Sequence, residues 1–352
     1  MQIHCDFPGG NIEVAGVWGQ TVWVRPALRD TAGNWFYWAF CVEGAQGKTL
    51  TFHFNESWLG YFGPAVSHDR QTWTWCGKDS MSEDRKTFTY SFSPEETCVY
   101  FAHHLLYPAN RVEKLARRLQ IPVTELTVSN GGNPVPMLCF GEGENIILLL
   151  ARHHCCESTG SYVLEGVTEY LGHNLPSDYR VIAVPFMDMD GVLRGDQGKN
   201  RIPHDHNRDY TDAPLYAEVR AVLDLVKKKP PKLSFDFHSP WHIGEGNDHV
   251  FLVRNLLNSE GQDAFSKILA KECKGLPFPY EADFDLIHFE RWNQMTPTAS
   301  AHHISLFPGV ELSLTVETAY FGTEDRPVSQ ENLLSLGNRF GKAICRYIKK
   351  TS

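Results

Sequence analysis

Three segments of the sequence carry metal-binding or acid–base side chains at the point where an apolar run ends. His154 and Glu157 follow one such run, His238 follows a second, and Glu317 follows a third. Two imidazoles and one carboxylate, with the third ligand far along the chain from the first two, form the ligand set of an open catalytic zinc site. We therefore predict that His154, Glu157 and His238 bind one zinc ion and leave a fourth position for water.

The first of these patterns is weak when it stands alone, because a His three residues before a Glu is common by chance. An alternative places His154 at the polar rim of a sheet and makes Glu157 a carboxylate that stabilises the start of the following helix. The second run favours the metal site, because it leads directly into His238. Asp236 either orients an imidazole from behind or accepts an ordinary strand-end hydrogen bond, and both interpretations stay open.

Acid–base chemistry at such a site needs a further carboxylate. A water that attacks a carbonyl beside a zinc ion needs a base to take its proton and deliver it to the leaving amine. Glu317 ends the third apolar run and suits that role. Glu311, six residues earlier, is expected to be an ordinary residue at the start of the strand. We predict that Glu317 is the catalytic base.

A long polar loop, 195–210, lies between the first two of these segments. Long ordered loops in compact domains are usually functional. Asn207 and Arg208 pair an amide with a guanidinium, which suits a two-point grip on a carboxylate. His204 and His206 could form a metal-binding pair, but they follow no apolar strand directly, so we expect loop polarity or substrate contact instead.

The nine cysteines are scattered and include one adjacent pair, Cys155 and Cys156, between two of the predicted ligands. A nucleophile or a further ligand is one interpretation of this pair, and small residues at a tight turn are the simpler one. The polar N-terminus resembles no export signal, so we expect reduced thiols and a cytoplasmic protein. Other histidines are expected at the surface or at a rim: His103, His104, His242, His302 and His303.

Charge and composition exclude several kinds of partner. The chain has 33 Lys and Arg against 42 Asp and Glu, a net charge of −9, which argues against nucleic-acid binding. No stretch approaches the roughly 20 apolar residues that span a bilayer, so no membrane association is expected. Hydrophobic residues make up 42%, which is typical of a globular protein with a sizeable core.

The segment 16–106 is rich in aromatic residues and consists of short alternating stretches separated by turn residues. Six stretches predict strands: Thr21–Arg25, Trp35–Val42, Leu50–Asn55, Gln71–Trp75, Thr87–Phe92 and Thr97–His103. Six strands without a convincing long helix indicate an antiparallel β-sandwich. We expect its aromatic side chains to fill the core and pair across strands, rather than to stack on a sugar.

After Pro108 apolar strands alternate with helices. The predicted helices are Asn110–Leu119, Gly160–Leu171, Ala213–Lys228, Ser259–Glu272 and Ser329–Ile348. The predicted strands are Val135–Phe140, Asn145–Ala151, Arg180–Phe186, Lys232–Phe237, His249–Arg254 and Val310–Glu317. This alternation predicts an α/β fold with a mixed, largely parallel sheet flanked by helices, whose site lies past the carboxyl ends of the strands. We therefore predict a β-sandwich domain over 1–108 and a catalytic domain over 109–352.

Together these segments resemble the zinc carboxypeptidase family (M14-type metallocarboxypeptidases), and most closely its cytosolic carboxypeptidase branch. The family pattern A-R-x-H-P-x-E-S corresponds to 151–158, and the turn N-P-D-G-V to 188–192, which departs at its first two positions. The segment G-x-D-L-N-R corresponds to 203–208. The D-x-H element and the strand that ends in the catalytic Glu correspond to 236–238 and 315–317. The N-terminal half also resembles the sandwich of that branch, so the resemblance covers nearly the whole chain.

The resemblance implies the same zinc ligands, His154, Glu157 and His238. It also implies that Glu317 is the catalytic base. It further implies that Asn207 and Arg208 hold the terminal carboxylate of a substrate. The family usually has an Arg nine residues before that Asn, which polarises the scissile carbonyl, and here Gly198 occupies the position. Lys199 or Arg201 could substitute, although a Lys presents a point charge rather than a fork.

A tyrosine that closes over the substrate is also typical of the family. Tyr280 and Tyr320 are the candidates for it in this sequence, and we expect both to be structural.

The leading hypothesis is a zinc-dependent metallocarboxypeptidase that hydrolyses the C-terminal peptide bond of peptides or proteins, with Glu317 as the base for a zinc-activated water. One alternative is a zinc-dependent amidohydrolase or deacylase of acyl-amino acids, for which the missing arginine leaves room. Another is a catalytically silent binding module, against which the complete set of residue types weighs. The absence of G-x-S-x-G counts against a serine hydrolase.

Overall fold

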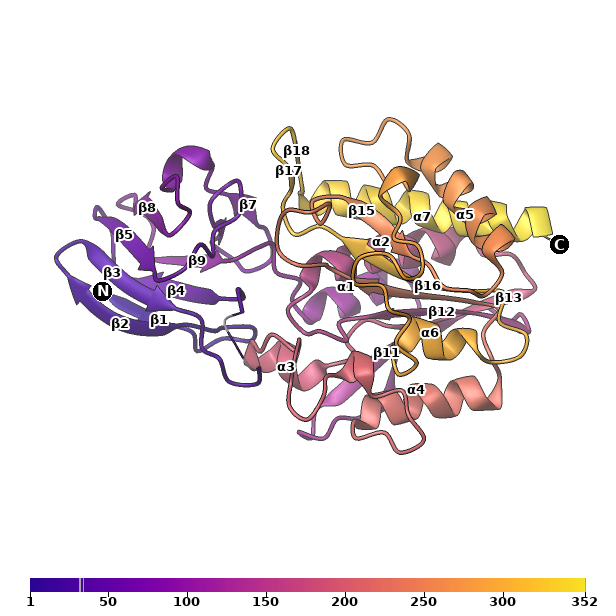
Figure 1. The fold of residues 1–352 in the computed structure, drawn as a ribbon. Helices are drawn as coiled ribbons and strands as arrows, with labels where there is room; N and C mark the ends of the chain where they lie inside the picture. Colours follow the sequence, from indigo (N-terminus) through magenta and orange to yellow (C-terminus); the bar gives the residue numbers. More distant parts are fainter. Residues whose placement is uncertain (32, 34, 352) are drawn as a thin grey trace.

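The structure is a computed structural model that describes residues 1–31, 33 and 35–351. Strands of residues 2–102 form a layered unit at one end of the molecule, and the later strands and the α-helices gather around a single sheet at the other end (Figure 1). This is the predicted order, a sandwich followed by an α/β fold.

Two sheets form the N-terminal unit. The five-stranded sheet has the order β1 (Gln2–His4), β4 (Ala39–Glu43), β9 (Cys98–Ala102), β6 (Ala65–Ser67) and β7 (Thr74–Trp75). The four-stranded sheet has the order β2 (Glu13–Trp18), β3 (Thr21–Arg25), β5 (Thr49–Phe54) and β8 (Thr87–Ser91). Within these sheets the neighbouring strands run antiparallel, except that β3 and β5 are parallel. The predicted sandwich is confirmed, with this parallel pair as its one departure.

Alternating side chains of the strands fill the sandwich. In β5 the side chains of Leu50, Phe52 and Phe54 are buried and those between them are half-buried. Phe52 stacks on Phe88 of β8, with ring centroids 4.7 Å apart. The aromatic residues therefore form much of the core, as expected, although Trp18 on β2 is 64% exposed.

Strands β1, β2 and β6 were not predicted. β1 and β6 have three residues each, which is too short for a visible period. β2 has six residues, none of them buried, so it shows no alternation of apolar and polar positions. Hydrophobic periodicity identifies only strands that present a face to the core.

A seven-stranded sheet forms the centre of the α/β part. Its order is β10 (Val123–Val128), β11 (Pro134–Phe140), β13 (Tyr179–Val184), β12 (Asn145–Ala151), β14 (Leu233–His238), β16 (Leu312–Thr318) and β15 (Val250–Val253). The four strands from β13 to β16 are parallel to one another, and β10, β11 and β15 pair antiparallel at the edges. The mixed sheet is confirmed, and its parallel part is the buried middle.

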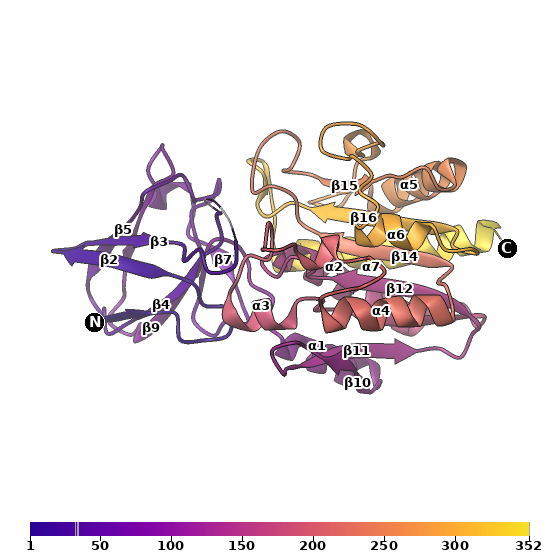
Figure 2. The same ribbon diagram turned by 60° about the horizontal axis from the view of Figure 1, so that its bottom comes forward.

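Helices cover both faces of this sheet (Figure 2). On one face α2 (Ser158–Asn174) packs along α7 (Gln330–Thr351), flanked by α1 (Asn110–Leu119) and α5 (Ser259–Cys273). On the other face lie α4 (Ala217–Lys228) and α6 (Ser300–Ser305). Among the described residues, none of the helices has the length and apolar character that a membrane span requires.

Several short elements of the α/β part were not predicted. They are β10, α6, the hairpin of β17 (Gly322–Thr323) and β18 (Arg326–Pro327), and α3 (Met189–Arg194). α3 replaces the turn expected over 188–192, because the Asp188 side chain accepts a hydrogen bond from the Gly191 N–H and caps the helix. Elements of two to six residues are too short to show a hydrophobic period.

Glycines permit the close crossing of α2 and α7. Gly166 of α2 faces Gly337 of α7, and a Cβ at Gly337 would lie 2.9 Å from the Gly166 Cα and against the Val163 carbonyl oxygen. Real Cβ atoms do not approach backbone so closely, so both helices would have to shift to admit a side chain. This contact fixes how closely α7 packs on the helix that follows the first proposed ligands.

Gly337→Ala is expected to lower the free energy of unfolding by about 1–3 kcal/mol, because the added methyl overpacks the helix crossing. At an exposed helical position the same substitution would raise stability by roughly 1 kcal/mol, so the sign of the change is informative. Chemical denaturation measures it. Asn338→Ala, at the exposed neighbouring position of α7, is the matched control. A variant as stable as the parent chain would contradict this packing.

Candidate metal centre

The carboxyl ends of three neighbouring parallel strands meet at one edge of the sheet. β14 lies between β12 and β16, with Ala151 opposite Phe237 and His238 opposite Glu317. The turn after β12 carries His154 and Glu157, so the fold brings the four strand-end residues to the same place. This is the edge where the sequence analysis expected a site.

The donor atoms of His154, Glu157 and His238 converge. The Nδ1 atoms of both histidines lie 2.8 Å from the two carboxylate oxygens of Glu157, one on each, and 3.3 Å from each other. A zinc ion about 2.0–2.1 Å from each donor in tetrahedral geometry would separate neighbouring donors by roughly 3.3 Å. The donor set and its spacing therefore fit one zinc ion after small shifts of the Glu157 carboxylate.

The electrostatics of this cluster favour a cation. Burial opposes charge on Glu157, but His154, Lys199 and His238 outweigh it and hold the pKa of its carboxyl well below its usual range. Burial also lowers the pKa of His238, yet Asp236 and Glu157 raise it well above the ordinary value. The cluster therefore holds an ionised carboxylate and a proton on an imidazole, which a metal ion would displace on binding.

Two carboxylates lie behind the histidines. Asp236 places one oxygen 2.9 Å from Nδ1 of His153 and the other 3.0 Å from Nε2 of His238. Asp205 places an oxygen 3.6 Å from Nε2 of His154. Carboxylates in such positions fix the tautomer and orientation of metal-binding imidazoles. Of the two interpretations of Asp236, the geometry favours orientation of an imidazole. Sequence reasoning missed His153 and Asp205 as parts of the site, and no spacing signal links Asp205 to His154.

Glu317 lies beside the cluster and is 6% exposed. Its Oε2 atom has no hydrogen-bond partner among the described residues. Burial raises the pKa of its carboxyl, His238 lowers it and Glu157 raises it again, with a net value of about 7. Glu311 lies outside the site and pairs with Lys232 at 2.9 Å, as expected for a residue at the start of the strand.

A cavity of about 420 Å³ opens over this cluster. Seven of the eight residues predicted for the site line it: His154, Glu157, Lys199, Asn207, Arg208, His238 and Glu317. Asn207 and Arg208 belong to a short 3-10 turn, η2 (His206–Arg208). Asn207 accepts a hydrogen bond from the Ser300 N–H through Oδ1, which leaves its amide nitrogen to donate.

The two cations expected near the site have different surroundings. Lys199 lies in the cavity, with Nζ 2.7 Å from a Glu157 oxygen and donating to the carbonyls of Ser239 and Pro240. Arg201 is not among the described residues that line the cavity; its Nη2 lies 2.7 Å from Asp188 in a separate ion-pair network. Of Lys199 and Arg201, it is thus Lys199 that the fold brings to the candidate metal centre.

Gly198 departs from the family pattern, and close packing at this position explains why the residue is a glycine. Its φ is +78°, and a Cβ there would lie 2.6 Å from the Cys155 nitrogen and 3.0 Å from the His154 Cα. No side chain fits at this close approach, whereas the next residue, Lys199, reaches the cavity. The Gly198 N–H donates to Asp30 of the sandwich at 2.9 Å, which holds the loop in place.

The remaining candidates are structural. Tyr280 and Tyr320 are both 1% exposed and neither is among the described residues that line the cavity. The Tyr280 hydroxyl bonds to Asp285, and that of Tyr320 lies 3.5 Å from Cys156 Sγ. Burial raises the pKa of the Cys156 thiol to about 12 and that of Cys155 well above its usual value. Neutral buried thiols favour small residues at a turn over a nucleophile.

Three histidines that we expected at the surface are buried. His103 is 0% exposed, His104 is 0% exposed and His242 is 7% exposed, so that prediction is wrong for them. Phe36 stacks between His103 and His242, with ring centroids 4.8 and 5.0 Å away. Burial lowers the pKa of His104 and of His242 to about 3. These imidazoles are neutral and pack as aromatic rings, a role that their polar character conceals in the sequence. His302 and His303 are half-buried.

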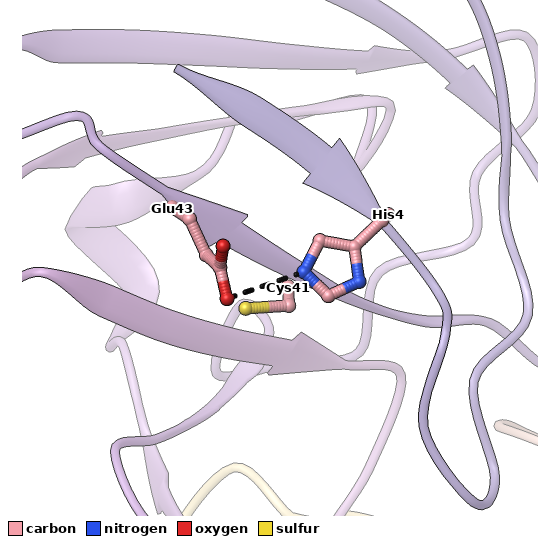
Figure 3. A group of neighbouring side chains, drawn as sticks. All are labelled: His4, Cys41 and Glu43. Carbon is pink, nitrogen blue, oxygen red and sulfur yellow. Dashed lines mark ion pairs between the residues drawn. The ribbon is translucent and has the colours of Figure 1, made fainter.

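A second group of possible metal-binding side chains, His4, Cys41 and Glu43, lies on the sandwich (Figure 3). Nε2 of His4 lies 3.5 Å from Glu43, and its Nδ1 accepts a hydrogen bond from the Asp6 N–H at 3.3 Å. A metal-binding imidazole usually donates through its second nitrogen. The arrangement is therefore that of a cross-strand His–Glu pair.

Known proteins share both parts of this architecture. Residues 3–104 match the family model of the cytosolic carboxypeptidase N-terminal domain. An uncharacterised protein of Zymomonas mobilis is 28% identical over 72% of this chain and 70% of its own length. Cytosolic carboxypeptidase 1 of Gallus gallus is 23% identical over 58% of this chain but 22% of its own length, so the chain spans about a fifth of that relative.

The crystal structure of a metallo-carboxypeptidase from Burkholderia cenocepacia has the same fold, with a TM-score of 0.81 at 21% identity over 100% of this chain and 99% of that one. The N-terminal unit thus matches that of the cytosolic carboxypeptidases, and the whole chain has the fold of a metallo-carboxypeptidase.

Proposed function

We propose that the protein is a zinc-dependent metallocarboxypeptidase that removes residues from the C-termini of peptides or proteins. His154, Glu157 and His238 hold the ion. The observation that carries the proposal is the convergence of three donor groups, 2.8–3.3 Å apart, in a cavity that also contains a carboxyl oxygen of Glu317 without a hydrogen-bond partner among the described residues. A bound zinc ion would polarise the scissile carbonyl and lower the pKa of a water.

Glu317 is the general base and acid of this proposal. Its carboxyl is buried, lies beside the proposed ligands and has an oxygen without a partner among the described residues. A pKa of about 7, raised mainly by burial, suits a group that takes a proton from water and returns it to the leaving amine.

Substrate is held by groups on the loop that follows α3. The Arg208 guanidinium and the free amide of Asn207 bind the terminal carboxylate of the substrate, which a guanidinium recognises with two parallel hydrogen bonds. The positive charge of Lys199, in the same cavity, stabilises the oxygen of the scissile carbonyl as negative charge develops on it. Arg201, paired with Asp188 and Asp30, holds this loop in shape.

A zinc-dependent amidohydrolase that acts on acyl-amino acids is the second candidate. The specific observation in its favour is Gly198, where no side chain fits. At the scissile carbonyl, the point charge of Lys199 therefore replaces the guanidinium that the family usually has there. Parallel assays of peptides and N-acyl amino acids separate the two activities.

We further propose that the chain divides near residue 108, with a sandwich domain over 1–108 and the catalytic domain over 109–352. We also propose that the protein acts in the cytoplasm. Nine cysteines without a disulfide among them, and the matched cytosolic family model, support that location.

Glu317→Gln is expected to lower kcat for C-terminal peptide hydrolysis by about 10²- to 10⁴-fold, because the amide cannot accept the proton of the attacking water. Zinc content, measured by elemental mass spectrometry, should stay at one ion per chain. Glu311→Gln, the same change six residues earlier, is the control and should retain full turnover. Unchanged turnover in Glu317→Gln would remove Glu317 from the mechanism.

Lys199→Met is expected to reduce kcat by roughly 10²- to 10³-fold with little change in zinc content, if Lys199 stabilises the developing oxyanion. A residue that only positions Glu157 would instead weaken zinc affinity, which a chelator competition measures. Lys232→Met, which removes an ion pair at the start of β14, is the matched control. Full activity of Lys199→Met would contradict the assignment.

In protein from which the metal has been removed, the buried carboxyl of Glu317 should make the free energy of unfolding depend on pH. Its pKa is raised from 4.5 to about 7 on folding, so the unfolded state loses the proton first as the pH rises. In chelated protein, the free energy of unfolding of the parent chain should therefore fall relative to Glu317→Gln between about pH 4.5 and pH 7. Denaturation at a series of pH values measures the difference. An equal pH dependence of the two chains would refute the raised pKa.

A further inference from the structure

A second cavity, which we call the junction cavity, lies between the sandwich and the α/β part. Its volume is about 630 Å³, and its wall includes Tyr37 and Trp73 of the sandwich together with residues of α1, β11 and α3. None of the described residues that line it also lines the cavity over the metal centre. It is therefore a separate space, of a size that takes small molecules.

The wall of the junction cavity is mostly apolar. Phe7, Tyr107, Val135, Val192 and Leu193 contribute to it from four different segments. A wall of this kind binds the apolar body of a ligand through the hydrophobic effect. The polar groups that would orient such a ligand come from Arg152 and Ser158, which also line the cavity.

Arg152 is a buried cation at this cavity. It is 4% exposed and lines the cavity, and its Nε donates to the Cys155 carbonyl at 2.6 Å. Its Nη1 is buried without a hydrogen-bond partner, and no carboxylate among the described residues forms an ion pair with it. Because a guanidinium stays protonated, its burial without a counter-ion is unfavourable unless an anion joins it.

Ser158 adds a second unpartnered polar atom. It is 1% exposed, lines the same cavity, and its Oγ has no hydrogen-bond partner among the described residues. Arg152 and Ser158 flank the turn that carries His154 and Glu157, so one turn presents two residues to each cavity. The Arg152 backbone has a φ of 66°, which a non-glycine residue seldom adopts, so the position of its side chain has a conformational cost.

We propose that the junction cavity binds an amphipathic carboxylate: a small molecule whose carboxylate pairs with Arg152 and Ser158 and whose apolar body packs on the wall. A monoanion is favoured over a phosphate dianion, because Glu113 and Glu125, which outnumber the further cation Arg70 in the lining, would repel the additional charge. The proposal uses neither the metal centre nor the peptidase activity, so it stands independently of the proposed function.

Calorimetry on the full chain, after removal of metal with a chelator, tests the proposal with decanoate and with decanol, its neutral counterpart. Decanoate should bind with one site per chain and at least about tenfold more tightly than decanol, because only decanoate pairs with the guanidinium. Arg152→Gln should lower the affinity for decanoate by about 10- to 100-fold, to the affinity for decanol. Arg117→Gln, which removes the same charge from an exposed position of α1, should leave the affinity unchanged.

A filled cavity provides the second test, and it covers the case in which Arg152→Gln does not fold. Leu193→Trp, at a half-buried position of α3 that lines the cavity, should abolish the binding of both probes while circular dichroism stays that of the parent chain. The proposal is overturned if decanol binds as tightly as decanoate, if Arg152→Gln binds decanoate as the parent does, or if Leu193→Trp retains binding, which would place decanoate elsewhere.

Discussion

The buried carboxylate of Glu157 is the group on which the rest of the site depends. It is fully buried, and its oxygens lie within 2.8 Å of His154, His238 and Lys199. A buried charge without partners is strongly unfavourable. The fold therefore has to bring the turn after β12, the end of β14 and the loop of Lys199 to one point. The parallel register of β12, β14 and β16 does this, because it aligns their carboxyl ends at one edge.

The sandwich contributes to this arrangement through the loop that carries Lys199. Asn11 donates to the Gly195 carbonyl at 2.7 Å, and Tyr37 donates to the Gln197 side chain at 3.1 Å. With the bond from Gly198 to Asp30, three contacts tie consecutive parts of the loop to the N-terminal unit. The sandwich thus holds the loop that carries Lys199, and so contributes to the geometry of the candidate metal centre.

The turn between β12 and α2 separates two chemically different spaces. His154 and Glu157 line the cavity of the candidate metal centre, and Arg152 and Ser158 line the apolar junction cavity. Gly198 packs against the backbone of this turn on the first side, so the turn has little freedom to move there. A ligand in one cavity would therefore contact the same short segment of backbone as a ligand in the other.

The sequence by itself determined the α/β architecture, the sandwich before it and the strands that carry the proposed ligands, because apolar runs and their periods depend on local composition. β12 and α1 have the predicted bounds, whereas β2 buries no residue, and α3 and α6, with six residues each, are too short to show a helical period. Only the tertiary structure decided that Lys199 rather than Arg201 lines the metal cavity, that Asp205 approaches His154, and that His103 is a neutral core residue. These features depend on contacts between segments far apart in the chain, and the spacing of residues along a sequence does not encode such contacts.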